Sequence, residues 1–206
     1  MRILVVGATG TIGRAVCDAL SPRHEVVRAS RHRSALRVDI AQPDSIRALY
    51  QAVGRVDAVV SAAGEARFAP LSTLRDEDFA FSLANKLMGQ VNLVRLGFDS
   101  VSDGGGFVLT SGVLARSPMP GSAAVSLVNA GLEGFARAAA LEAPRGVRVN
   151  VVSPPWVTET LRALGMDPRP GLPAAQVAQT YVQAVEGRQT GEVLEPKKDS
   201  RPATRL

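Results

Sequence analysis

Three glycines near the start of the chain have the spacing of a phosphate-binding turn. Gly7, Gly10 and Gly13 stand at intervals of three in GATGTIG, directly after the apolar run 2–6. Between a strand and a helix, such glycines permit a tight turn, close approach of a pyrophosphate and packing of the helix on the strand. The helix N-terminus then offers free N–H groups to the phosphates. The segment therefore predicts a dinucleotide site. The residues expected to contact the dinucleotide here are Gly7, Thr9, Gly10, Thr11, Ile12 and Gly13.

The end of the second apolar run indicates which dinucleotide binds. NAD sites place an acidic residue there for the ribose diol, whereas NADP sites place a cation for the 2′-phosphate. The run ends in RASRHR, and its only acid, Glu25, stands at the opposite end. Arg31 is the predicted phosphate clamp, with Ser30 and Arg33 in support and Arg14 as a further candidate. We therefore expect NADP(H) in preference to NAD(H), and the alternative interpretation is a solvated basic turn.

Strand-like and helix-like segments alternate along the chain. The short β-branched runs that predict strands are 2–6, 25–29, 55–61, 106–111, 146–153 and, more weakly, 191–196. The helical patterns lie at 12–20, 43–53, 75–97, 122–142 and 173–187. This alternation predicts an α/β fold, a single-domain doubly wound parallel sheet of the Rossmann type with about seven strands and helices on both faces. We expect the domain to span 1–196, with 197–206 as a polar, flexible tail.

Composition restricts the class of protein. The 206 residues suffice for one domain, and 24 basic against 19 acidic residues give a net charge of +5, which favours anionic partners. The basic clusters lack aromatic stacking residues, so we expect no nucleic-acid partner. Because Cys17 stands alone and no apolar stretch has the length of a signal peptide or membrane span, we expect a cytoplasmic protein without a membrane partner. No Cys/His cluster has metal-ligand spacing, and His24 and His32 lie far from the other candidate residues.

Several stretches together resemble the short-chain dehydrogenase/reductase family. GATGTIG is similar to that family's opening, although Thr11 stands where typical members have a middle glycine. Asp39 in RVDI matches the aspartate that the family places near the adenine. The segment SAAG (61–64) resembles the Asn-Asn-Ala-Gly motif without its asparagines, and FVLTSG places the catalytic serine on Ser111. Residues 130–154 resemble the family's main helix and the strand that follows it.

The resemblance extends over roughly residues 2–196 and implies further contacts to the cofactor. SPPWVTET resembles the family's Pro-Gly-x-x-x-Thr segment at the nicotinamide, with Pro155 in place of the glycine and Thr158 or Thr160 available for the carboxamide. Trp156 is a candidate for the pocket wall, and a surface-covering role is the alternative. The cofactor contacts that the resemblance adds are Asp39, Ala62, Ala63, Gly64, Pro154, Trp156 and Val157.

The family's Tyr-x-x-x-Lys pair is absent from the sequence. The resemblance places the tyrosine on Val125 and the lysine on Asn129. In the preceding helix the family has an asparagine in Asn-Leu-x-Gly, and KLMG places Lys86 there. Asn85 is adjacent, and a shift of one residue would turn the side chain by about 100°. Read in this register, the lysine and the asparagine have exchanged helices.

The lost tyrosine decides what chemistry remains possible. Reduction of a carbonyl develops negative charge on oxygen, which needs a hydrogen-bond donor and then a proton. Valine supplies neither. Lys86 is a candidate replacement donor, since a desolvated ammonium beside a positively charged nicotinamide loses its proton more easily. The alternative is a structural or ribose-binding role for Lys86. The predicted catalytic set is Ser111, Lys86 and Asn129.

The sequence is compatible with two alternative functions. The first is an NADP(H)-dependent oxidoreductase of the short-chain type that acts on an unknown small carbonyl or alcohol through a non-standard active site. The second is an NADP(H)-binding sensor or regulatory protein without dehydrogenase turnover. The resemblance also implies a homodimer or homotetramer formed through the helices at 75–97 and 122–142.

Overall fold

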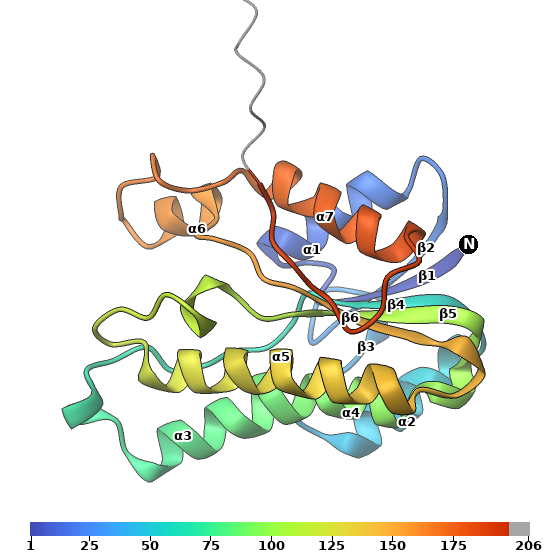
Figure 1. The fold of residues 1–206 in the computed structure, drawn as a ribbon, viewed down its shortest axis with the longest axis horizontal. Coiled ribbons are helices and arrows are strands. Elements are labelled where there is room, and N and C mark those ends of the chain that lie inside the picture. The colour runs from blue at the N-terminus through green and yellow to red at the C-terminus, as the bar shows by residue number, and fades with distance from the viewer. Residues whose placement is uncertain (198–206) are drawn as a thin grey trace, which may run out of the picture.

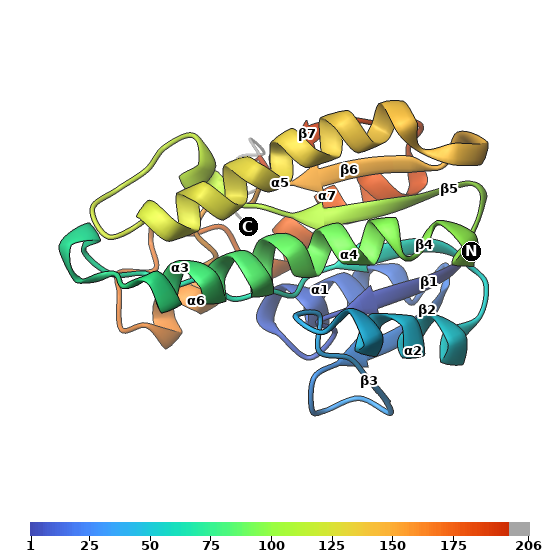
Figure 2. The ribbon, with the colours of Figure 1, turned by 90° about the horizontal axis from the view of Figure 1, so that it is seen from below.

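The computed structural model describes residues 1–197, and these residues fold around one parallel sheet. Figure 1 shows the sheet edge-on between two layers of helices. Its seven strands follow the order β3-β2-β1-β4-β5-β6-β7 (Figure 2). Its strands are β1 (Arg2–Val6), β2 (Glu25–Ser30), β3 (Leu36–Arg37), β4 (Val56–Ser61), β5 (Val101–Thr110), β6 (Arg148–Val152) and β7 (Val193–Leu194). The central strands are apolar and buried because helices cover both faces of the sheet.

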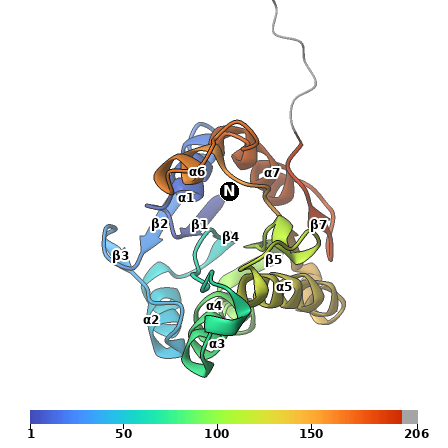
Figure 3. The same cartoon turned by 90° about the vertical axis from the view of Figure 1, so that its left-hand side faces the viewer.

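Helices lie on both faces of the sheet, as Figure 3 shows end-on. One layer holds α1 (Thr11–Leu20), α6 (Thr158–Ala163) and α7 (Ala174–Glu186). The opposite layer holds α2 (Pro43–Val53), α3 (Asp76–Ser82), α4 (Gly89–Arg95) and α5 (Ala123–Glu142). Short 3₁₀ turns occur at Leu71–Thr73, Phe98–Ser100, Val113–Ala115 and Pro144–Gly146. The doubly wound fold predicted from the sequence is therefore confirmed.

Each layer of helices closes its own apolar core. Beneath α1 and α7, Tyr181 and Cys17 are both fully buried and belong to the same apolar cluster. On the opposite face, Phe107 packs edge-to-face on Phe98 with the ring centroids 5.7 Å apart. Tyr50 donates from its hydroxyl to the Leu93 carbonyl at 2.5 Å. Burial raises the pKa of both the Tyr50 and the Tyr181 phenols, so each tyrosine is a neutral packing residue.

Four elements differ from the sequence prediction. The sequence predicts no helix at α6, because six residues are too few to show a helical period. β3 was not predicted, because a strand of two residues beside polar turns leaves no apolar run. β5 begins at Val101, and the glycines and polar residues of its first half conceal that start. The helix predicted at 75–97 is interrupted by a π-helical turn, Leu83–Met88, that joins α3 to α4 (Figure 2). Except for Lys197, the predicted tail lies outside the described residues.

The chain reverses its winding between β1 and β4. From β1 it proceeds outward through β2 and β3, and then returns to β4 on the other side of β1. All the paired strands are parallel, so their carboxyl ends meet at one edge of the sheet. In doubly wound folds, ligands bind in the crevice at such a switch point. The fold therefore predicts that a ligand site lies among the loops that follow β1, β4, β5 and β6.

Candidate functional site

The turn between β1 and α1 is built by backbone contacts that exclude side chains. Gly7 has a φ of +85°, and a Cβ there would lie 2.5 Å from the Ala62 oxygen. A Cβ on Gly13 would lie only 2.0 Å from the Gly7 oxygen. Gly10 leads into α1 with extended backbone, and no side chain caps the helix. The first N–H groups of α1 are therefore available to an anion, which is the geometry that a dinucleotide pyrophosphate requires.

Two adjoining cavities lie over the carboxyl ends of the strands. The outer cavity, of about 280 Å³, is lined by residues that include Gly7, Gly10, Ser30, Arg31, Asp39 and Asn85. The inner cavity, of about 250 Å³, is lined by residues that include Ile12, Lys86, Ser111, Gly112, Val125, Asn129 and Trp156. Both are also lined by Ala62, Ala63 and Gly64. This shared wall makes one groove from the two cavities, long enough to run from the end of β2 to the end of β5.

Most residues predicted to contact the cofactor line this groove. Thr9 lines the outer cavity, while Pro154 and Val157 line the inner one. Gly13 supports the turn from beneath, and Thr11 instead faces a separate cavity beside Arg14. Of the two threonine candidates after β6, the lining of the inner cavity includes Thr160 and does not include Thr158. Trp156 is part of the wall of the inner cavity, which agrees with the first of the two roles suggested for it by the sequence.

The predicted phosphate clamp pairs with the residue predicted to lie near the adenine. One nitrogen of Arg31, Nη2, donates to both Asp39 carboxylate oxygens at 3.1 Å. The Ser30 hydroxyl oxygen accepts from the backbone N–H of Arg33 at 3.1 Å, which leaves its O–H free to donate. The Arg33 side chain lines a neighbouring cavity together with Thr9 and Arg14. Among the predicted cations, only Arg31 therefore lines the outer cavity within the described part of the chain.

Lys86 occupies the inner cavity from the π-helical turn. Its Nζ donates to the Ser111 carbonyl oxygen at 3.2 Å. Asn85, the alternative in the neighbouring register, instead accepts the Glu65 backbone N–H on its Oδ1 at 2.8 Å and lines the outer cavity. Burial lowers the pKa of the Lys86 ammonium to about 8. No carboxylate is part of the described lining of the inner cavity to offset that desolvation.

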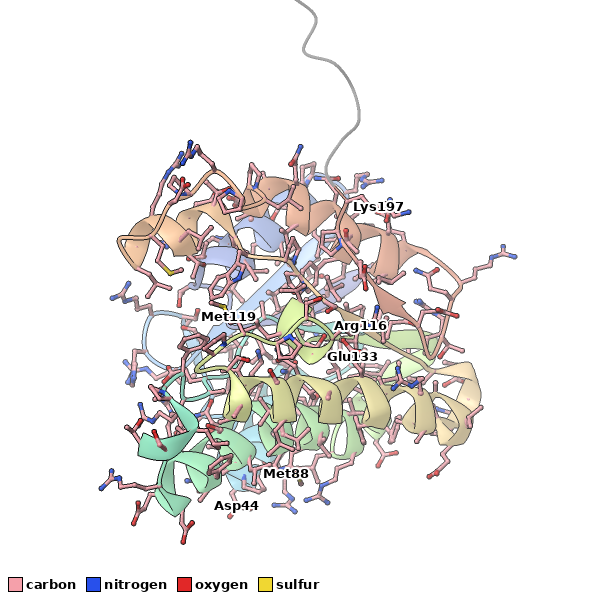
Figure 4. All side chains as sticks on the ribbon, turned by 60° about the vertical axis from the view of Figure 1, so that its left-hand side comes forward. Asp44, Met88, Arg116, Met119, Glu133 and Lys197 are labelled. Atoms are coloured by element: carbon pink, nitrogen blue, oxygen red, sulfur yellow. The ribbon has the colours of Figure 1, made fainter. Side chains whose placement is uncertain are left out.

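The Ser111 hydroxyl points to a buried carboxylate. Its Oγ donates to Glu133 Oε1 on α5 at 3.1 Å. Arg116 approaches the other carboxylate oxygen of Glu133 at 3.3 Å and also contacts Glu195 after β7. Figure 4 shows Arg116 and Glu133 side by side above α5. Because its proton is directed to Glu133, the hydroxyl must rotate before it can donate into the inner cavity.

The two positions at which the family's acid and lysine are missing both lie on the inner cavity. Val125 forms part of the cavity wall. Asn129 is buried, with Nδ2 at 3.4 Å from the Gly112 carbonyl and with an Oδ1 that has no partner among the described residues. A Cβ on Gly112 would lie 3.1 Å from Asn129 Nδ2, so these two residues are in direct contact. The structure thus brings together Lys86, Ser111 and Asn129, the three residues predicted to be catalytic.

The sequence offers a second signal for Lys86. The chain has three lysines, Lys86, Lys197 and Lys198, so every cation from residue 1 to 196 except Lys86 is an arginine or a histidine. Arginine cannot lose its proton in a protein, whereas lysine does so when it is buried. Glu133 gives a weaker signal, since it is the one acid of α5 besides its last residue, Glu142. Lys86 and Glu133 are thus both recognisable from the pattern of residue types.

Comparison with known proteins identifies the family. The family model described as enoyl-(acyl carrier protein) reductase matches residues 14–193. The chain belongs to the short-chain dehydrogenase/reductase family. The 3-oxoacyl-[acyl-carrier-protein] reductase FabG of Escherichia coli is 30% identical over 192 residues, which cover 82% of this chain and 79% of that protein. The hydroxynaphthalene reductase arp2 of Aspergillus fumigatus is 34% identical over 65% of this chain, a match that spans only 52% of the reductase.

Solved structures agree with this placement. The protein lin1944 from Listeria innocua has 43% sequence identity and a TM-score of 0.90, with 95% of this chain and 98% of that chain covered. A small-chain dehydrogenase in complex with NADPH has 23% identity and a TM-score of 0.83 over 95% of each chain, which shows that it shares the fold.

Two features of other protein classes are absent from residues 1–197. No group of three or more His, Cys, Asp or Glu residues there could hold a metal ion. No helix within these residues is long and apolar enough to cross a membrane.

The burial of Lys86 predicts a pH-dependent stability. Lys86→Met should raise the free energy of unfolding at pH 7 by on the order of 2 kcal/mol, because methionine fills the cavity without a desolvated charge. In the wild type the folded pKa of about 8 lies below the unfolded value of about 10.4. At a pH between these two pKa values, Lys86 is protonated only in the unfolded state, so the free energy of unfolding of the wild type rises with pH. The stability difference between Lys86→Met and the wild type therefore shrinks as the pH rises. Urea unfolding at pH 7, 8.5 and 10 measures this difference, with Lys197→Met as the control. A difference that stays constant with pH would contradict the desolvated ammonium.

Proposed function

We propose that the protein is an NADP(H)-dependent oxidoreductase that reduces a small carbonyl compound through a non-standard active site. The observation that carries this proposal is the position of Lys86, a desolvated ammonium in the inner cavity of the groove that begins at the glycine turn. When bound, the reduced nicotinamide supplies a hydride to the carbonyl carbon. Loss of solvation makes the Lys86 proton easier to transfer than that of an exposed lysine.

In this proposal Lys86 does the work of the missing tyrosine. Its ammonium donates a hydrogen bond to the carbonyl oxygen and then transfers its proton there, which yields an alcohol and a neutral amine that solvent reprotonates. The Ser111 carbonyl, at 3.2 Å from Nζ, orients the ammonium before the substrate binds. Asn129 lines the same cavity and helps to shape the oxygen-binding position, whereas Val125 contributes only apolar surface. Ser111 serves as a second donor after its hydroxyl rotates away from Glu133.

A specific observation also favours the second function. The cavity wall at Val125 has no proton to give, and the Ser111 hydroxyl is engaged by Glu133. A protein that kept the groove and gave up catalysis would have these features, and it would act as an NADP(H)-binding sensor. Both functions require that the protein binds NADP(H), but only the oxidoreductase turns over a substrate. Measuring nucleotide binding and turnover together therefore separates them.

Turnover should depend on Lys86. We expect NADPH oxidation with at least one member of a panel of aldehydes, ketones and quinones. Lys86→Met should reduce that rate by about 10² or more, because the proton donor is lost. Its dissociation constant for NADPH should stay within about threefold of the wild type. Rates are followed by absorbance and binding by calorimetry. Nucleotide binding without turnover on the whole panel would favour the sensor, and wild-type turnover in Lys86→Met would refute the donor role.

The Arg31 guanidinium supports a preference for NADP(H). In the outer cavity it lies beside Asp39, which partly neutralises it, and a 2′-phosphate offers it a second, doubly charged partner. Arg31→Ala should weaken NADPH binding by about tenfold and change NADH binding by less than threefold. Arg47→Ala, which removes an exposed arginine from α2, is the control. Equal affinity of the wild type for the two nucleotides would contradict the clamp.

Homo-oligomerisation through α3 to α4 and α5 is also a proposal. Met88 and Leu127 are exposed apolar side chains on these helices, with 42% and 50% of their surface accessible. Figure 4 shows Met88 at the surface of the helical layer. Light scattering should give a dimer or tetramer of the 21.6 kDa chain. Met88→Glu combined with Leu127→Glu should yield a monomer, while Leu164→Glu, outside these helices, should not. A monomeric wild type would overturn this proposal. The predicted cytoplasmic location stays a prediction.

A further inference from the structure

Gln90 is a fully buried polar residue at the start of α4, one helical turn beyond Lys86. Its side-chain Oε1 accepts the backbone N–H of Thr110 at 2.8 Å. Its Nε2 donates to the Thr110 carbonyl at 2.9 Å. The Gln90 amide therefore forms hydrogen bonds with both the N–H and the C=O of Thr110, which a neighbouring strand would otherwise bond.

The sheet explains why Thr110 needs this partner. Thr110 ends β5, and the next residue, Ser111, directs its N–H to Val152 of β6 at 3.0 Å. The N–H and C=O of Thr110 therefore face the side of β4, where the ladder between the strands ends at the Val60–Val108 pair. A buried peptide group without a partner is destabilising, because it has lost its hydrogen bonds to water. Gln90 supplies the hydrogen bonds that β4 no longer provides.

The same amide also contacts the turn that carries Lys86. Nε2 of Gln90 lies 3.3 Å from the Lys86 carbonyl oxygen, which accepts a hydrogen bond from it. This carbonyl belongs to the π-helical turn Leu83–Met88, where the regular backbone ladder of the helix is broken. On its other side Lys86 is close to Gly64, on which an added Cβ would lie 3.0 Å from the Lys86 Cα. Gln90 thus joins the Lys86 turn to the end of β5, directly beside the Ser111 carbonyl that receives Nζ.

We propose that Gln90 is a positioning residue that holds Lys86 in the inner cavity by fastening the π-helical turn to the end of β5. This inference rests on the proposed function of Lys86 and adds a residue that touches neither substrate nor cofactor. A merely structural role would make Gln90 variants less stable without moving the ammonium. A positioning role requires that loss of the amide releases Lys86 toward solvent.

The test reads the Lys86 ammonium directly by NMR. The full chain is labelled with ¹³C-lysine, which gives only three side-chain signals. The wild-type Lys86 signal should titrate near pH 8. Gln90→Met, of similar volume, should raise that pKa by one unit or more toward the ordinary value of 10.5, since a released side chain regains solvent. Asn92→Leu is the matched control, because it removes another buried amide, one that accepts from Arg95, and it should leave the titration unchanged.

The outcomes separate this proposal from the proposed function. A folded Gln90→Met protein with an unchanged Lys86 titration overturns the positioning role, whatever the turnover of the wild type. Absence of turnover in the wild type contradicts the donor role and leaves the NMR test intact.

A measurement on the wild type keeps the proposal testable if Gln90→Met does not fold. The Gln90 side-chain amide protons should exchange with solvent at least 100-fold more slowly than those of the exposed Gln51. They should also shift as Lys86 titrates, because Nε2 contacts the Lys86 carbonyl. Exchange as fast as that of Gln51, or no shift through pH 8, overturns the proposal.

Discussion

The close approach of three backbone segments at the carboxyl end of β1 is the constraint on which the site depends. Gly7 packs against Ala62 after β4, and Gly13 packs against Gly7 from the first turn of α1. Any side chain at either glycine would collide with backbone that has no room to move. This packing fixes the start of α1 over the switch point of the sheet, with its free N–H groups directed into the groove. The outer and inner cavities are the two ends of that groove.

The inner cavity combines apolar walls with one ammonium. Val125 and Trp156 are among the residues that line the cavity, and the π-helical turn brings Lys86 into it. Desolvation, rather than a neighbouring charge, lowers the pKa of this lysine. An arginine in the same place would stay charged at every pH. The choice of lysine, in a chain whose other cations up to residue 196 are arginine or histidine, agrees with a role that requires a transferable proton.

Two polar networks, each with a buried side chain at its centre (Glu133 or Gln90), hold the strand ends around this cavity. Glu133 accepts from Ser111 and Arg116, and Arg116 reaches Glu195 beyond β7. Gln90 completes the hydrogen bonding of Thr110 from the opposite side. Such groups are costly when unpaired, so their pairing fixes the positions of the loops that they join. The carboxyl end of β5 is thereby held between α4, which follows the π-helical turn that carries Lys86, and α5, which carries Asn129.

The sequence by itself determined the fold and the dinucleotide turn, because alternating apolar runs and the spacing of Gly7, Gly10 and Gly13 are local properties of the chain. It also placed Lys86 and Asn129 on neighbouring helices. Only the tertiary structure decided which neighbouring side chain enters which cavity. A π-helical turn directs Lys86 inward and Asn85 elsewhere, and the Ser111 hydroxyl meets Glu133. These orientations depend on contacts between residues far apart in the chain, which no local pattern records.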